Sequence, residues 1–95
     1  MISSMISMEI LVIVRWQGIQ LVLTQAAYYE LIDLKFDLYD VLEILERGSN
    51  CERSKRAKGT IEKCLRKKGK RYKAVVVKST YLGDPAWKII HVGKI

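Results

Sequence analysis

The sequence has little of the residues on which metal and cofactor sites depend. Its 95 residues include one histidine, one proline and two cysteines. Cys51, Cys64 and His91 follow one another at separations of 13 and 27 positions, which fits no familiar zinc pattern, and the chain has no Gly-rich phosphate loop. We therefore expect no metal site and no bound cofactor.

Catalytic constellations are also scarce. No serine or cysteine has an evident base beside it, and the only histidine, His91, shares one side of an expected strand with Trp87 and Ile89. A lone histidine in that setting is more often packed than poised as a general base. These residues leave enzymatic activity open, with His91 as a weak catalytic candidate.

Long hydrophobic runs are absent as well. The longest, residues 10–14, is far short of the roughly 20 residues that cross a bilayer. No cation precedes Arg15 and no small-residue cleavage site follows, which argues against a secretory signal. We expect a cytoplasmic protein without membrane contact, in which Cys51 and Cys64 are free thiols rather than one disulfide bridge.

The apolar content, 49% of residues, suits a single domain over residues 1–95. Residues 3–17 combine helical spacing with a β-branched cluster, so we expect a helix there and keep a strand as the alternative. A short strand over 19–23 follows. Thr24 is a good N-cap for a helix to Asp33, and Asp37 is one for a second helix that Gly48 ends.

From Thr60 the apolar period changes to two. The pattern predicts a strand over 60–66, a turn over 67–70, a strand over 71–82 and a last strand over 87–92. The fold class is therefore α+β: an N-terminal helix or strand, a short strand, two helices, and a three-stranded antiparallel meander with the helices packed on one face.

Charge is unevenly distributed along the chain. Residues 1–50 hold three cations and seven acids, net −4, whereas residues 51–95 hold fourteen cations and three acids, net +11; the two sums give the overall +7. Residues 51–73 alone hold eleven Lys or Arg and two acids. Such a block favours contact with phosphate or with an acidic protein.

We expect this small basic protein to bind RNA or another polyanion through the 51–73 loop and hairpin. Strand alternation spreads the cations over both faces of the hairpin, so the loop over 53–58 is the stronger candidate. Tyr72, Tyr81 and Trp87 offer aromatic faces for bases. The residues expected to contact nucleic acid are Arg53, Lys55, Arg56, Lys58, Arg66, Lys68, Arg71 and Lys73.

Two other interpretations of the cationic block stay open. Lysines on strands also prevent edge-to-edge aggregation, so the hairpin could be merely soluble. Alternatively, the chain is an interaction module whose cationic sheet pairs with an acidic partner. The partner could be a second copy of the chain, because acid and base on one chain permit a homodimer.

The chain carries, in this order, Leu23-Thr24-Gln25, the acidic helix 37–47, the strand Tyr72 to Val77 and Ile90-His91-Val92. Through these residues, positions 23–92 resemble a family of small domains related in layout to the BrnT-type and RelE-type toxins. Where that family's first helix has a histidine and two arginines, this chain has Ala26, Glu30 and Leu34.

The resemblance implies a RelE-like fold of a sheet packed with helices. For the toxin branch it also implies metal-independent RNA cleavage, with Lys, Arg and Tyr polarising phosphate. The residues of suitable type near the hairpin are Arg56, Lys58, Arg71 and Tyr72. A toxin-like ribonuclease is therefore the alternative function.

Overall fold

The computed structural model describes residues 13–51 and 58–95. The rest of the expected N-terminal helix, and the loop residues Arg53, Lys55 and Arg56, lie outside the described residues. The elements are β1 (Arg15–Trp16), β2 (Ile19–Leu23), α2 (Gln25–Leu34), α3 (Leu38–Arg47), β3 (Ser49–Asn50), β4 (Thr60–Lys67), β5 (Lys70–Tyr81) and β6 (Asp84–Lys94).

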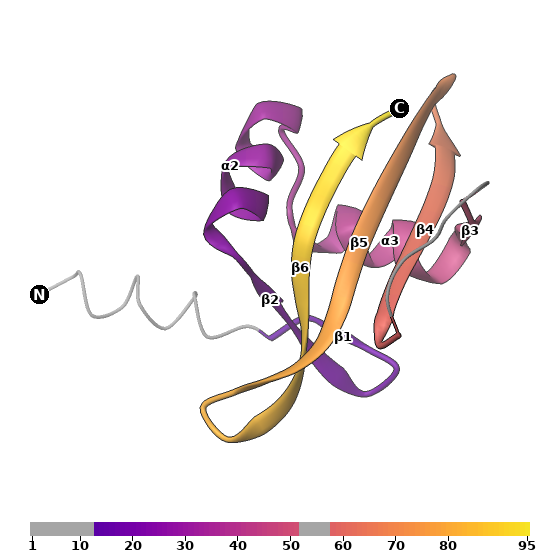
Figure 1. Ribbon diagram of the computed structural model, residues 1–95. Coiled ribbons are helices and arrows are strands. Elements are labelled where there is room, and N and C mark those ends of the chain that lie inside the picture. Colours follow the sequence, from indigo (N-terminus) through magenta and orange to yellow (C-terminus); the bar gives the residue numbers. More distant parts are fainter. Residues whose placement is uncertain (1–12, 52–57) are drawn as a thin grey trace, which may run out of the picture.

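The α+β class is confirmed, but the sheet has six strands, in the order β1-β2-β6-β5-β4-β3, which is more than the expected short strand and three-stranded meander. All neighbouring strands are antiparallel except β2 and β6, which run parallel. In Figure 1, α3 crosses one face of the twisted sheet, and α2 lies beside the upper part of β6. The expected meander is thus only part of a larger sheet.

Local signals set the ends of both helices, as the sequence predicts. The Thr24 hydroxyl accepts a hydrogen bond from the Ala27 N–H, and α2 ends at Lys35 in the left-handed conformation. Asp37 and Asp40 form a capping box at the start of α3, each side chain accepting from the other's backbone N–H.

Gly48 ends α3 for a reason that the sequence does not reveal. Its φ of −74° is available to any residue, but a Cβ there would lie 2.4 Å from the Ile44 carbonyl oxygen and 2.7 Å from that of Cys64. The end of α3 therefore approaches β4 at a distance that only glycine permits.

The core lies between α3, α2 and one face of the sheet. Val41 and Ile44 of α3 and Val76 and Ile89 of the sheet are fully buried in it. Ile61 and Leu65 of β4 pack against the same cluster, so this is the face of β4 that α3 covers. We call it the α3 face, and Glu62, Cys64 and Arg66 belong to the opposite face.

The N-terminal helix expectation is wrong for its described end. Arg15 and Trp16 pair with Gln20 and Ile19 as a hairpin strand, and the Trp16 ring packs on that of Trp87 with centroids 5.3 Å apart. The alternative expectation, a strand, holds for Arg15 and Trp16.

Cys51 and Cys64 are joined by a disulfide, so the expectation of free thiols is also wrong. Pairing of β3 with β4, in which Ser49 lies opposite Cys64, brings the two cysteines together. Separately, none of the helices in the described part of the chain has the length and apolar character to cross a membrane.

Candidate functional site

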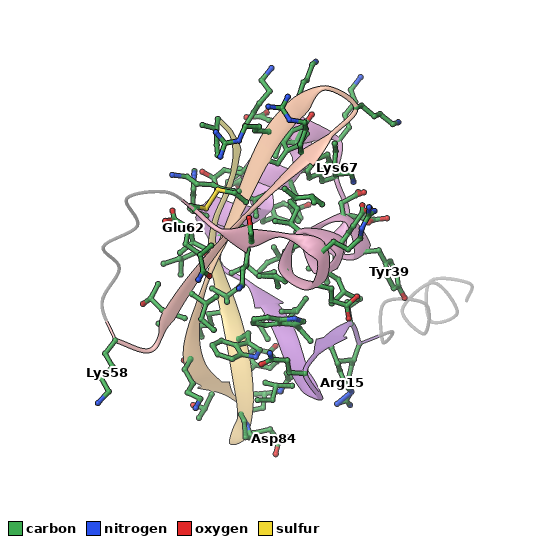
Figure 2. All side chains as sticks on the ribbon, turned by 90° about the vertical axis from the view of Figure 1, so that its right-hand side faces the viewer. Arg15, Tyr39, Lys58, Glu62, Lys67 and Asp84 are labelled. Atoms are coloured by element: carbon green, nitrogen blue, oxygen red, sulfur yellow. A yellow bond between two sulfur atoms is a disulfide. The ribbon has the colours of Figure 1, made fainter. Side chains whose placement is uncertain are left out.

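The turn of the β4–β5 hairpin gathers cations from both strands. Arg66 lies directly opposite Arg71 and Lys67 opposite Lys70, while Lys68 and Gly69 form the turn with φ values of 51° and 79°. Two successive positive φ values are typical of a type I′ turn, and glycine adopts the second without strain. In Figure 2 several nitrogen-tipped side chains extend from this end of the hairpin.

Lys67 differs from its neighbours because it points toward α3. Its ammonium lies 2.7 Å from Glu43 and 3.3 Å from Asp40, and it sits 5.2 Å from the centre of the Phe36 ring. Only 19% of its side chain is exposed. Asp40 and Glu43, which helical spacing places in water, thus form an ion-pair cluster with the hairpin.

The pKa shifts of this cluster follow from its contacts. The hydrogen bond from Lys67 lowers the pKa of Glu43 below its ordinary 4.5, and Arg47 lowers it further. Partial burial acts to raise the pKa of Asp40, but hydrogen bonds from the Asp37 N–H and Lys67 outweigh it and hold that pKa below 3.8. The Glu43 carboxylate in turn raises the pKa of Lys67 above 10.5. All three groups are therefore charged at neutral pH.

Lys73 is the second lysine of the hairpin with a carboxylate partner. Its ammonium lies 3.4 Å from the buried Glu62 on the face opposite α3. Cys64, whose sulfur is in the disulfide, is directly across the strands from Lys73. Lys67 and Lys73 therefore stabilise the hairpin on one face each, and we call them the anchored lysines.

The remaining cations of the hairpin end have no such partner. Within residues 13–51 and 58–95, no carboxylate lies within ion-pairing distance of Arg66, Lys68, Lys70 or Arg71. All four are exposed. We call these four residues the cationic tip.

The structure does not bring all the expected site residues together. Arg66, Lys68 and Arg71 belong to the cationic tip, and Lys73 lies next to it but is anchored. Lys58 precedes the start of β4, at the opposite end of the hairpin from Lys67, as Figure 2 shows. Arg71 and Tyr72 therefore do not form a catalytic cluster with Lys58.

His91 has a carboxylate partner that the sequence did not indicate. Its Nδ1 lies 2.8 Å from one oxygen of Glu30, and the other oxygen accepts from the Val92 N–H at 2.9 Å. A carboxylate that orients an imidazole is a known arrangement for a general base. Sixty-one positions separate the two residues, so no local pattern could have paired them. Glu30 is one of the positions where the chain departs from the family it resembles.

Of the three aromatic residues considered for base stacking, one lies beside the cationic tip. The Tyr72 ring packs against Phe36, with ring centroids 4.9 Å apart. Tyr81 is 45% exposed but lies at the other end of β5, whereas Trp87 is buried against Trp16. Of the three, Tyr72 is therefore the residue that lies beside the cationic tip.

Among the residues that the structure describes, no group of three or more His, Cys, Asp or Glu side chains is arranged to hold a metal ion. Comparison of the chain with protein-family models, with curated proteins and with solved structures gave no match.

Proposed function

We propose that the protein binds RNA or another polyanion through the cationic tip. The observation that carries the proposal is that Arg66, Lys68, Lys70 and Arg71 are exposed together at one hairpin end, with no described carboxylate to neutralise them. Like charges held this close repel one another. An approaching row of phosphates would relieve that repulsion and release its own counterions.

The form of the tip suits backbone contacts better than base-specific ones. Arg66 and Arg71 lie opposite each other on the face away from α3, and Lys68 and Lys70 lie at and after the turn. Arginine binds a phosphate with two parallel hydrogen bonds, whereas lysine acts as a point charge. Binding of this type is strongly salt-dependent and has little sequence preference.

The expected location and the resemblance to toxins are separate from the binding site itself. A cytoplasmic location agrees with an RNA ligand, but the Cys51–Cys64 disulfide weighs against a reducing compartment. The relation to BrnT-type and RelE-type toxins rests on sequence residues alone. RNA cleavage is therefore an alternative outcome of the experiment below, and self-association of the chain is a second alternative.

The test compares two triple variants with the same change of charge. One removes tip residues (Lys68→Gln, Lys70→Gln, Arg71→Gln), and the other removes cations elsewhere (Arg15→Gln, Lys78→Gln, Lys88→Gln). Binding of a labelled single-stranded RNA and of heparin is measured by fluorescence anisotropy over a range of salt concentrations.

We expect the tip variant to lose about 100-fold in affinity at low salt and its log-log salt slope to fall by about 2, because each phosphate contact to a single strand contributes about 0.7. The control variant should lose far less. Equal losses in the two variants would show that binding is not located at the tip. Absence of binding to both ligands by the wild type would reject the proposal, and RNA cleavage in the same samples would favour the ribonuclease alternative.

A further inference from the structure

A cavity of about 290 Å³ lies beside the cationic tip, between the hairpin turn and the connection from α2 to α3. Its size is at the lower limit of the about 300–1,000 Å³ typical of ligand pockets. Its aromatic and charged lining consists of Lys35, Phe36, Asp40, Lys67, Lys68 and Tyr72.

Two aromatic rings form one wall of this cavity. Phe36 follows the left-handed Lys35, and its N–H donates to the Leu31 carbonyl at 2.9 Å, which holds the Phe36 backbone at the end of α2. The Tyr72 ring is inclined at 56° to that of Phe36. Both side chains are only half-buried, so aromatic surface remains accessible at the cavity.

The charged residues of the cavity are of two kinds. Lys67 and Asp40 are paired with each other, and Asp40 also receives the Asp37 N–H, so their polar groups are already engaged. Lys35 and Lys68 are exposed, and no carboxylate of residues 13–51 and 58–95 pairs with either. Two exposed ammonium groups thus lie next to the aromatic wall. One of them, Lys68, is also part of the cationic tip.

We infer that this cavity binds one nucleotide of the RNA held by the cationic tip, with its base against Tyr72 and Phe36 and its phosphate at Lys35 and Lys68. The inference rests on the proposed function and adds a subsite that distinguishes nucleic acid from other polyanions. Every base has a π face, so stacking of this kind tolerates any sequence. An ordinary polyanion such as heparin would use the tip and leave the cavity empty.

The experiment separates the base from the phosphate. Binding of a single-stranded RNA is compared with binding of an abasic oligonucleotide of the same length, for the wild type and for Tyr72→Leu. Leucine keeps the apolar contact with the core but removes the aromatic face. Tyr81→Leu is the matched control, because it changes an exposed tyrosine at the far end of the same strand.

We expect Tyr72→Leu to weaken RNA binding by about 10-fold, within the range measured for loss of one stacked base, and to leave abasic binding unchanged. Tyr81→Leu should change neither. If Tyr72→Leu leaves RNA binding intact, or weakens RNA and abasic binding equally, the proposal of a base subsite fails. Binding at the cationic tip would be unaffected by that result. If the wild type binds neither ligand, the proposed function itself fails.

A second measurement does not depend on the folding of Tyr72→Leu. Adenosine 5′-monophosphate and ribose 5-phosphate are titrated into the wild type and into Lys35→Gln, with binding followed by NMR shifts of the cavity residues. We expect the nucleotide to bind better than the sugar phosphate and Lys35→Gln to weaken it several-fold. Equal binding of the two compounds would overturn the inference, and free nucleotide bound as tightly as the RNA would identify a free nucleotide, not RNA, as the ligand.

Discussion

The turn end of the hairpin carries two groups of cations that the sequence does not distinguish. The anchored lysines, Lys67 and Lys73, each contact a carboxylate, at 2.7 Å from Glu43 and 3.4 Å from Glu62. The cationic tip, within the same few positions of the same strands, contacts none among the described residues. Neighbouring lysines such as Lys67 and Lys68 therefore differ in their surroundings, because Lys67 is held in an ion-pair cluster and Lys68 is exposed.

Charge density along the sequence thus overestimates the charge available to a partner. Because side chains alternate along a strand, Lys67 lies on the α3 face, where it pairs with Asp40 and Glu43 of the helix. The acidic and basic halves of the chain meet inside one fold and partly neutralise each other. At the turn end of the hairpin, the cations left without a described carboxylate partner are those of the cationic tip.

The largest expected effect comes from removing the Cys51–Cys64 disulfide, which lies beside the anchored Lys73. The double variant Cys51→Ser, Cys64→Ser should lose about 3 kcal/mol of stability, since the bond closes a loop between residues 13 positions apart. RNA affinity should stay within about twofold, because Cys64 is not part of the tip. Urea unfolding measures the first quantity and anisotropy the second. A parallel loss of affinity would show that the two regions are not independent.

The next effect separates the two kinds of lysine directly. Lys67→Met should lower the melting temperature by about 4 °C, because Asp40 and Glu43 lose their partner, whereas Lys68→Met should change it by about 1 °C or less. RNA affinity should fall more for Lys68→Met than for Lys67→Met. Calorimetry and anisotropy on both variants test this, and equal thermal effects would remove the distinction between anchored and tip residues.

The smallest effect is the pH dependence of the anchored cluster. The pKa values of Asp40 and Glu43 are lower in the folded state than in the unfolded state, where they are near 4. The contribution of these two groups to stability is therefore present above the unfolded-state pKa values and is lost as pH falls through the folded-state values. Because the pKa of Lys67 is raised, its contribution to stability is fully present below the unfolded value of 10.5 and is lost as pH rises through the folded one. The melting-temperature difference between wild type and Lys67→Met should therefore be constant from about pH 6 to 9 and shrink toward pH 3. A difference that persists at pH 3 would indicate that the pair stabilises by packing instead.

Sequence reasoning succeeded where the signal is local. Thr24 and Asp37 cap their helices as expected, because capping needs only a side chain and a backbone N–H three residues on. The turn at Lys68-Gly69 and the alternation of β4 are of the same kind. The placement of Arg66, Lys68 and Arg71 at one hairpin end follows from them.

Most features that sequence reasoning missed join residues that are distant in the sequence. Parallel pairing of β2 with β6, the disulfide, the pairing of Lys67 with the α3 acids and that of His91 with Glu30 depend on packing, not on a motif. The two-residue strands β1 and β3 are too short to show any period. The cavity beside Tyr72 likewise exists only because the end of α2 meets the hairpin.

Glu30 has one further consequence, for how copies of the protein can associate. β2 stops alongside β6 at Ile89, and beyond that point the backbone of β6 would offer donors and acceptors to a strand from another molecule. Thr24 occupies the Ile89 carbonyl and Glu30 occupies the Val92 N–H, so α2 covers the first positions where such a strand would begin. Thr24 and Glu30 therefore satisfy two backbone groups of β6 with which a strand from a second copy would otherwise pair.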